Sequence, residues 1–264
     1  MNRQSPMKGL IKKAFRQFGF DLTRLDSTRN PDLECIADGT EADKRIVVSV
    51  MPFTMASVAR IAALLDAVGY LSRNAIPGDM AECGVWRGGS MMAVALALLA
   101  RNDTTRSLYL YDTFEGMVPA GDVDRSYDGK SAESQREPQW CHAGLDDVRR
   151  NLLSTGYPSD RIHFVKGRVE ATIPGVIPEQ LSLLRLDTDW YESTKHELAH
   201  LFPRLSDRGI MIVDDYGHWQ GSRKAVDEYF QERNECVFLH RIDYTARLVV
   251  KHAASASEPA RVAD

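Results

Sequence analysis

Apolar and polar positions along this chain follow two different periods, and the switches between them predict the order of its elements. Short apolar runs bounded by polar residues are typical of buried strands, whereas apolar residues that return every three to four positions are typical of helices. The expected strands cover residues 79–83, 107–111, 162–166, 183–186 and 209–213, followed by a closing pair at 236–241 and 246–251. The expected helices cover residues 57–74, 90–99, 146–154, 193–201 and 222–231.

Strands and helices alternate in this order, which indicates an α/β fold. Regular alternation favours a doubly wound, mostly parallel sheet that is covered by helices on both faces. With the closing pair, the sheet would have seven strands. We therefore predict one large α/β domain over residues 53–252.

The first fifty residues predict a separate N-terminal helical extension. Residues 6–20 mix apolar with basic positions in a roughly helical rhythm. Such a helix packs on its own domain or across a subunit contact, or lies on a membrane surface. Residues 26–45 are polar and charged and suggest a linker, so that residues 1–52 form an extension with its linker. The tail at 253–264 is rich in alanine, serine and proline and is predicted to be disordered.

A long polar stretch interrupts the alternation at residues 114–144. A loop of this length without a periodic pattern is commonly a binding loop or a lid when it occurs in a compact domain. Two interpretations stay open: a substrate lid over residues 118–143, and a plain insertion.

Composition and charge argue against several classes of protein. Hydrophobic residues at 44% and charged residues at 27% are ordinary for a soluble globular domain. The chain has 33 basic and 37 acidic residues, a net charge of −4 that gives no general attraction to nucleic acid. Its four cysteines are scattered and predict neither a zinc site nor a disulfide framework. No apolar run suits a signal peptide or a membrane span, so we predict a cytoplasmic protein.

Aspartates follow two of the expected strands, where a parallel sheet gathers its ligands. Asp187 and Asp189 come directly after the strand at 183–186, and Asp214 and Asp215 come after the strand at 209–213. Four carboxylates at one sheet edge repel one another unless a proton or a bound cation compensates their charge. An all-carboxylate set favours a hard cation such as Mg²⁺, whereas zinc more often recruits cysteine or histidine.

A cation at this edge would suit chemistry on a hydroxyl group. Coordination lowers the pKa of a hydroxyl group, and a carboxylate within hydrogen-bond reach can take its proton. Asp187 and Asp189 are two positions apart and would face the same side of an extended strand, so one would bind the metal and the other take the proton. The structural alternative is that these aspartates cap helices, as Asp189 could cap the helix at 193–201.

A glycine-rich turn at residues 84–89 follows the first expected strand. Glycines in a strand-to-helix turn let the backbone approach a ligand at the helix N-terminus, although such a turn can also be a mere tight connection. The G-x-G-x-x-G spacing of dinucleotide sites is absent, because Trp86 and Arg87 occupy the middle of the turn. Asp112 ends the next strand, where an acidic residue can accept hydrogen bonds from both ribose hydroxyls of a nucleoside or cap a turn.

Four motifs together resemble the macrocin O-methyltransferase (TylF/MycF) family. They read GDMAECGVWRGG at residues 78–89, YDTFEGM at 111–117, LDTDWYEST at 186–194 and VDDYG at 213–217. The resemblance extends from residue 53 to residue 230. It implies a class I, Rossmann-like methyltransferase fold. It also implies an enzyme that uses S-adenosylmethionine and Mg²⁺ to methylate sugar hydroxyls on antibiotics and related glycosides.

The resemblance also implies roles for individual residues. The cofactor would be held by Glu82, Gly84, Val85, Gly88, Ser90, Asp112, Thr113 and Phe114. The turn from Glu82 to Ser90 would hold its methionine end, and Asp112 its ribose. Asp187, Asp214 and Asp215 match the metal ligands of the family, and Asp189 matches the position suited to a general base.

Three further residues could contact the acceptor or orient it. His218 and Trp219 follow the second acidic motif, and His142 ends the long loop, although a lone histidine is more often structural. The alternative functions are a nucleotide-dependent oxidoreductase on a similar fold and a non-catalytic nucleoside-binding protein. The expected partners are a small glycoside and, in a homo-oligomer, further copies of the chain. Neither nucleic acid nor a membrane span is expected.

Overall fold

The computed structural model describes residues 31–135 and 140–252, and the chain divides into two compact units, residues 1–37 and 38–264. In the first unit the described part is a short 3₁₀ helix, η1 (Pro31–Ile36). The helix predicted at 6–20 and the tail predicted from residue 253 lie outside the described residues. The domain boundaries predicted at 52 and 252 stay predictions.

The second unit is built on one seven-stranded sheet with the strand order β3-β2-β1-β4-β5-β7-β6. The parallel strands are β1 (Asp79–Cys83), β2 (Leu108–Asp112), β3 (Ile162–Lys166), β4 (Leu181–Leu186) and β5 (Leu205–Val213). β7 (Arg247–Val250) pairs antiparallel with β5 and with β6 (His240–Arg241). The predicted doubly wound, mostly parallel sheet is confirmed. Its strand order reverses between β1 and β4, which is where sheets of this kind bind ligands.

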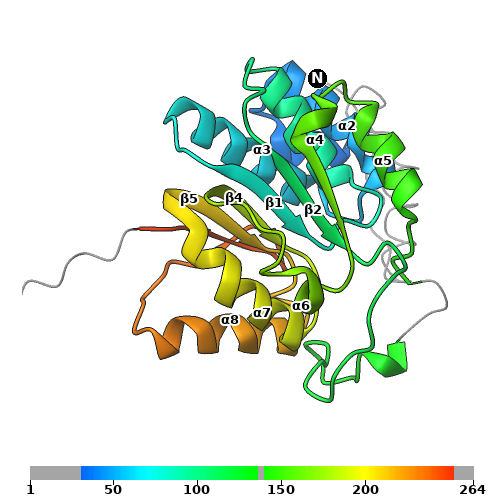
Figure 1. Cartoon of the computed structure of the whole chain (residues 1–264), viewed down its shortest axis with the longest axis vertical. Coiled ribbons are helices and arrows are strands. Elements are labelled where there is room, and N and C mark those ends of the chain that lie inside the picture. Colours follow the sequence, from blue (N-terminus) through cyan, green and yellow to red (C-terminus); the bar gives the residue numbers. More distant parts are fainter. Residues whose placement is uncertain (1–30, 136–139, 253–264) are drawn as a thin grey trace, which may run out of the picture. The chain divides into compact units, whose positions relative to one another are not determined.

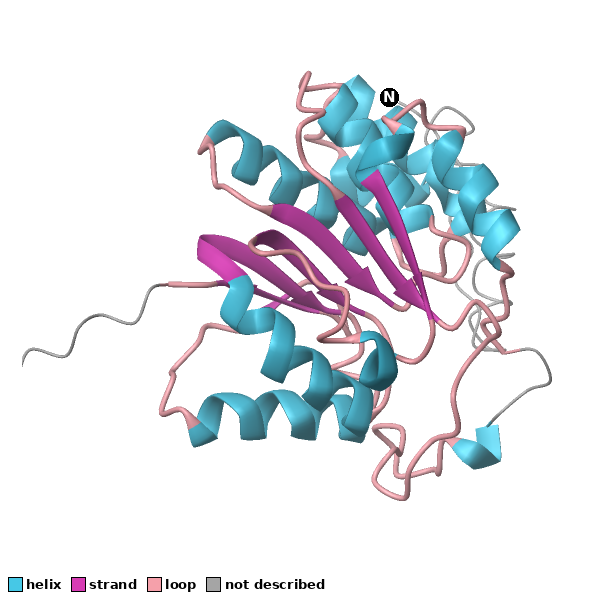
Figure 2. Ribbon diagram, in the orientation of Figure 1, coloured by secondary structure: helices cyan, strands magenta, loops and turns pink. Residues whose placement is uncertain are grey.

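Helices cover both faces of this sheet (Figure 1, Figure 2). One face carries α2 (Glu41–Val50), α3 (Val58–Arg73), α4 (Gly89–Leu99) and α5 (Leu145–Leu153), and the other carries α6 (Val169–Thr172), α7 (Tyr191–Leu201) and α8 (Gln220–Glu232). Short 3₁₀ turns are η2 (Met51–Phe53), η3 (Glu133–Gln135), η4 (Ser159–Arg161) and η5 (Phe202–Arg204). β4 is buried along its whole length, which explains why it is apolar except for Ser182 and Arg185. None of the helices that the structure describes is long and apolar enough to cross a membrane.

The predicted linker is wrong at its C-terminal end, because α2 begins within it. Thr40 caps this helix: its side chain accepts a hydrogen bond from the N–H of Asp43, whose carboxylate accepts one from the N–H of Thr40. Ile46, Val47 and Val50 form the buried stripe of the helix. The charged residues that suggested a linker lie in the same helix as this stripe, as in any amphipathic helix at a surface.

Four strands differ in length from their predictions. β4 begins at Leu181 instead of residue 183, and β7 has four residues instead of six. β5 begins at Leu205 instead of residue 209, and the exposed residues Asp207 and Arg208 interrupt its apolar pattern. Its pairing with β4 shifts register near Leu181, as expected for a bulge. β6 has two residues instead of six, and the preceding Phe238 is 82% exposed.

The long loop is anchored to the domain in its described part. Asp124 is 2% exposed, and its carboxylate accepts hydrogen bonds from the N–H groups of Tyr191 at 2.9 Å and Gly121 at 2.7 Å. Ser126 forms an isolated antiparallel bridge with Trp219. The loop is therefore tied to the starts of both α7 and α8. Its role as a lid stays a prediction.

Candidate active site at the carboxyl edge of the sheet

A cavity of about 360 Å³ opens at the carboxyl ends of β1, β2, β4 and β5. This volume falls in the range of small-molecule sites. The predicted site residues in its wall are Gly84, Val85, Asp112, Thr113, Asp187, Asp189, Asp214, Asp215, His218 and Trp219. The fold thus brings together residues from all four motifs and from the start of α8.

The glycine-rich turn packs directly against the end of β4. Gly84 adopts a φ of +80°, and a Cβ atom added to it would lie 2.0 Å from the carbonyl oxygen of Asp187. Only glycine fits such a close approach, which fixes the distance between the turn and the acidic edge. Gly88, with a φ of +86°, precedes α4 as its N-cap residue, so the turn ends at the N-terminus of a helix. Backbone N–H groups at such an end suit a carboxylate or another anionic group.

Asp112 ties the end of β2 to the glycine-rich turn. Its Oδ2 accepts hydrogen bonds from the N–H groups of Val85 at 2.7 Å and Trp86 at 3.2 Å, and its Oδ1 accepts one from Phe114 at 2.8 Å. Burial raises the pKa of Asp112, although these backbone hydrogen bonds oppose the shift. The carboxylate therefore both shapes the turn and lines the cavity, where it can accept hydrogen bonds from a ligand.

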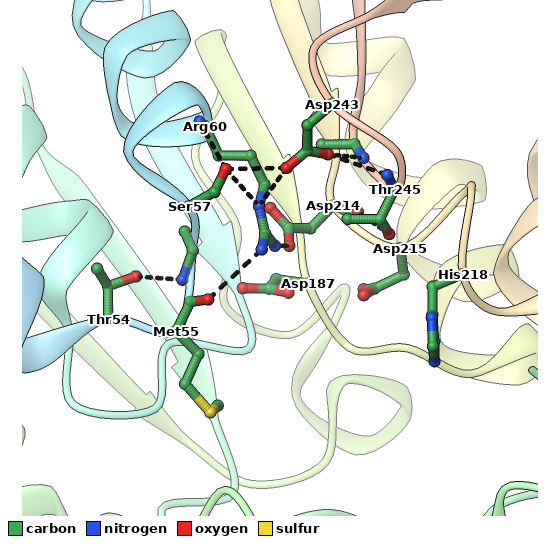
Figure 3. A network of polar contacts seen from close by, with 12 residues as sticks. Thr54, Met55, Ser57, Arg60, Asp187, Asp214, Asp215, His218, Asp243 and Thr245 are labelled. Carbon is green, nitrogen blue, oxygen red and sulfur yellow. Dashed lines mark hydrogen bonds and ion pairs between the residues drawn. The ribbon is translucent and has the colours of Figure 1, made fainter. Parts of the chain in front are cut away.

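Three of the four predicted aspartates form a compact cluster. Asp187, Asp214 and Asp215 each offer one carboxylate oxygen, and these atoms all lie within 4.8 Å of one another. Figure 3 shows the three side chains around one space, with His218 at its rim. The cluster arises because β4 and β5 are adjacent and parallel, so that residues directly after each strand meet at one edge.

Two arginines that the sequence analysis did not predict lie among these carboxylates. Arg185, in β4, is 3% exposed and donates hydrogen bonds to Glu82, Asp187 and Asp214. Arg60, from α3, donates to Asp214 as well. The sequence signal for Arg185 is a single charge inside an apolar run, because a buried arginine needs carboxylate partners. Arg60 carries no comparable signal, since a charge on an amphipathic helix is ordinary.

The carboxylates of the acidic cluster resist ionisation in spite of these arginines. Burial, together with the neighbouring carboxylates, raises the pKa of Asp187 well above its ordinary value, although Arg185 opposes the shift. Burial and the charges of Asp189, Asp187 and Asp214 raise the pKa of Asp215 in the same way. A group of carboxylates that resists ionisation is stabilised by a bound cation. The oxygen-only donor set and its spacing therefore fit Mg²⁺.

Asp189 lies beside the cluster in a conformation that is uncommon for aspartate. Its φ is +66°, and its N–H donates a hydrogen bond to Oδ2 of Asp215 at 3.3 Å. Burial raises the pKa of Asp189 to about 6, and the charges of Asp214 and Asp124 add to the effect. The alternative that Asp189 caps the next helix is wrong, because Asp124 accepts the first N–H of α7 instead.

Aromatic side chains form the other wall of the cavity. Trp140 and Trp219 line the cavity and pack together with Trp190, with ring centroids 5.0 to 6.1 Å apart. His218 meets Trp219 edge to face, and its Nδ1 lies 3.3 Å from the hydroxyl oxygen of Tyr244. Trp140 comes from the long loop and was not predicted, although its position directly before Cys141 and His142 placed it in the segment considered as a lid.

Five predicted site residues are not in the wall of the cavity: Glu82, Gly88, Ser90, Phe114 and His142. Glu82 is 1% exposed, because its carboxylate turns inward to the guanidinium of Arg185. Gly88 and Ser90 are buried where the turn enters α4, and Phe114 is 3% exposed. His142 is exposed, next to Gly116. These residues support the wall or lie outside it.

Comparison with known proteins places these features in one enzyme family. The family model of macrocin O-methyltransferase (TylF) matches residues 12–251. An 8-demethyl-8-(2,3-dimethoxy-alpha-L-rhamnosyl)-tetracenomycin-C 4'-O-methyltransferase of Streptomyces olivaceus is 34% identical over 212 residues, 79% of this chain and 80% of that protein. A mycinamicin III 3''-O-methyltransferase of Micromonospora griseorubida is 34% identical over 177 residues, 67% of this chain and 69% of that protein.

Solved structures share the fold. The O-methyltransferase NovP superposes with a TM-score of 0.69 at 29% identity, over 76% of this chain and 83% of its own. The calicheamicin methyltransferase CalS11 superposes with a TM-score of 0.57 at 18% identity, over 94% of both chains. The second likeness extends over more of the chain but bears on the fold alone.

Proposed function

Since this chain belongs to the macrocin O-methyltransferase (TylF) family, it is an O-methyltransferase, and we propose that it methylates a sugar hydroxyl of a glycosylated natural product. The methyl donor is S-adenosylmethionine and the reaction depends on Mg²⁺. The observation that carries this proposal is the cluster of Asp187, Asp214 and Asp215, with Asp189 beside it, in one cavity with the glycine-rich turn. The names of two relatives support the acceptor class, because one is a 4'-O-methyltransferase of a rhamnosyl-tetracenomycin and the other a 3''-O-methyltransferase of mycinamicin III.

The donor would lie across the carboxyl ends of β1 and β2. Asp112 faces the cavity there and would accept hydrogen bonds from the ribose hydroxyls. Gly84 and Val85 would present backbone to the methionine end, because the turn has no bulky side chain at Gly84. S-adenosylmethionine supplies a methyl group on a positively charged sulfur, which the negative edge of the sheet favours.

The acceptor would lie between the acidic cluster and the aromatic wall. Asp187, Asp214 and Asp215 would hold Mg²⁺, which lowers the pKa of a hydroxyl that it coordinates. His218 and Trp219 line the same part of the cavity and would contact the sugar ring. Trp140, from the long loop, would help to exclude water from the reacting atoms.

Asp189 is the proposed general base. Its pKa of about 6 leaves the carboxylate ionised at neutral pH yet more basic than an ordinary aspartate. As the acceptor oxygen forms its bond to the methyl carbon, the bond from that carbon to sulfur breaks. The hydroxyl proton passes to Asp189, and the products are the methyl ether and S-adenosylhomocysteine. Because Asp189 takes the proton, the cluster of Asp187, Asp214 and Asp215 would serve to hold and orient the acceptor.

The two alternative functions agree less well with the family and with the site. Membership of a family of O-methyltransferases removes the nucleotide-dependent oxidoreductase as an interpretation. A non-catalytic nucleoside-binding protein would have no need of three clustered aspartates beside a fourth. The cytoplasmic location and the homo-oligomer stay predictions.

The proposal is tested by methyl transfer from labelled S-adenosylmethionine to a panel of deoxysugar glycosides. We expect EDTA to abolish transfer, Mg²⁺ to restore it, and Zn²⁺ to be a poor substitute at an all-oxygen site. Full activity after exhaustive chelation would remove the metal from the mechanism and leave the methyltransferase. Absence of transfer to every glycoside, with transfer to a non-sugar phenol, would overturn the acceptor class.

A further inference from the structure

Arg60 reaches the acidic cluster from outside the sheet. It lies in the first turn of α3, its side chain is 16% exposed, and its Nη1 donates a hydrogen bond to Oδ2 of Asp214 (Figure 3). Arg185 donates to Oδ1 of the same carboxylate from within β4. Each oxygen of Asp214 thus has a guanidinium partner of its own, so the carboxylate cannot rotate without losing one of them.

The other two nitrogens of the Arg60 guanidinium have partners of their own. Oδ2 of Asp243 lies 3.1 Å from Nε of Arg60, and the carbonyl oxygen of Met55 accepts a hydrogen bond from Nη2 at 3.4 Å. Ser57 donates to the same oxygen of Asp243 at 2.9 Å. A guanidinium pinned by three neighbouring segments is a fixed donor and not a side chain that swings into the cavity.

The turn that contains Asp243 also holds the backbone of Asp214. Oδ1 of Asp243 accepts hydrogen bonds from the N–H groups of Thr245 and Ala246, both at 2.9 Å. The hydroxyl of Thr245 in turn donates to the carbonyl oxygen of Asp214 at 2.8 Å. One turn, between β6 and β7, therefore fixes Asp214 twice, through its main chain directly and through its side chain by way of Arg60.

We propose that Arg60 is a positioning residue that presents the carboxylate of Asp214 to a bound divalent cation, and that Asp243 holds Arg60 in place for this task. The proposal rests on the Mg²⁺ site of the proposed function. Partners that orient the ligands of a metal typically contribute about 10- to 100-fold to metal affinity. Arg60 also lines the cavity beside Met55, so the same contact links the metal site to the wall near the acceptor.

A competing interpretation makes Arg60 a substitute for the cation. In that case the guanidinium would compensate the carboxylates only until a metal displaced it, and weakening its contact would tighten metal binding. The contacts of Arg60 with Asp243 and Met55 argue against displacement, because they do not depend on Asp214. When the contact between Arg60 and Asp214 is weakened, the positioning role predicts weaker metal binding and the substitute role predicts tighter metal binding. A measurement of metal affinity therefore separates the two interpretations.

The test measures Mn²⁺ affinity by electron paramagnetic resonance, with displacement by Mg²⁺, on the full chain without acceptor. Arg60→Lys keeps the charge but loses the planar fork that joins Asp214 to Asp243. We expect Mn²⁺ to bind roughly tenfold more weakly to this variant. The matched control is Arg106→Lys, because Arg106 also contacts an aspartate, a backbone carbonyl and a serine, but next to Gly78 at the opposite edge of the sheet. The control should bind Mn²⁺ like the wild type.

Asp243→Asn tests the second half of the proposal. It should weaken Mn²⁺ binding in the wild-type background. It should add little in the Arg60→Lys background, because both substitutions disrupt the contacts that link Asp243 through Arg60 to Asp214. An equal effect in both backgrounds would mean that Asp243 acts by its own charge and would overturn its role through Arg60. Thermal unfolding of each variant checks that the fold is intact.

The outcomes separate this inference from the proposed function. If the wild type binds Mn²⁺ and Arg60→Lys binds it equally or more tightly, the positioning role fails and the Mg²⁺ site stands. If the wild type binds neither Mn²⁺ nor Mg²⁺, the metal-dependent function fails and this inference fails with it.

Discussion

The backbone of Gly84 packs against the carbonyl group of Asp187, so closely that a Cβ atom on Gly84 would lie 2.0 Å from the Asp187 carbonyl oxygen. Gly84 belongs to the turn proposed to hold the methyl donor, and Asp187 belongs to the cluster proposed to hold the metal. Their contact sets the distance between the two halves of the site. A reaction in which an oxygen must meet a methyl group in line depends on such a fixed distance.

Gly84→Ala should therefore weaken both halves of the site together. Its φ of +80° disfavours alanine, and the clash is with backbone, which cannot move aside as a side chain can. We expect a loss of about 2–5 kcal/mol in the free energy of unfolding, the sum of overpacking and backbone strain. Calorimetric titration with S-adenosylhomocysteine should show weaker binding. Gly156→Ala is the matched control, because Gly156 has a φ of +79° but no atom within 4 Å of its added Cβ. Equal stability losses in the two variants would contradict the importance of the contact.

Glu197 is a fully buried acid beneath the loop that carries Asp187 and Asp189. It is 0% exposed, and its Oε1 accepts a hydrogen bond from the hydroxyl of Thr188 at 2.9 Å. Burial raises the pKa of Glu197 well above its ordinary value. The folded protein therefore holds a proton that the unfolded chain releases near its ordinary pKa of about 4.3.

The sign of the resulting pH dependence follows from this proton. The stability linked to Glu197 is fully present below the unfolded pKa and is lost as the pH rises towards the folded pKa. Glu197→Gln keeps the acceptor for Thr188 but carries no proton to lose. Its stability relative to the wild type should thus increase by about 1.4 kcal/mol for each pH unit above about 4.3, until the folded pKa of Glu197 is reached. Urea unfolding from pH 4.5 to pH 7 measures the difference, with Glu192→Gln, an exposed residue of the same helix, as the control for the substitution. A difference that does not grow with pH would show that Glu197 is ionised in the folded protein.

Asp124 should hold the long loop to the start of α7. Asp124→Ala removes both hydrogen bonds of its carboxylate and exposes the N–H of Tyr191. We expect trypsin to cleave after Arg125 or Lys130 several-fold faster, since opening of the loop precedes cleavage. Mass spectrometry of the fragments locates the cleavage. Asp122→Ala is the control, because Asp122 is exposed in the same loop. Equal cleavage rates in both variants would mean that Asp124 does not anchor the loop.

The sheet and most of the acidic edge could be predicted from the sequence because both depend on local pattern. β4 reads as a mostly apolar run, and Asp187 and Asp214 follow their strands directly. Parallel pairing then brings them together without further information. The α2 helix was missed for the opposite reason, since its cap at Thr40 lies in a segment whose charges resemble those of a linker.

The partners of the acidic cluster could not be predicted in the same way. Arg60 and Asp214 are 154 positions apart, and their contact depends on how α3 packs against the sheet. The anchor at Asp124 depends on how the loop folds back onto α7, 67 positions further along the chain. The order of the elements along the chain predicts which elements pack together, but it does not predict where an individual side chain points. Contacts of this kind therefore need the structure.

Asp187 is proposed to bind the metal and Asp189 to take the proton, two roles within one loop. The measurement that tests this assignment most directly is the rate of labelled methyl transfer as a function of Mg²⁺ concentration, for the wild type, Asp187→Asn and Asp189→Asn, at saturating acceptor. We expect Asp187→Asn to need far more Mg²⁺ for half-maximal activity. We expect Asp189→Asn to keep the wild-type Mg²⁺ requirement and to lose about a hundred- to ten-thousand-fold in rate, which excess metal does not restore. Rescue of Asp189→Asn but not of Asp187→Asn by excess Mg²⁺ would reverse the two roles. Full activity of both variants would contradict the account of this site.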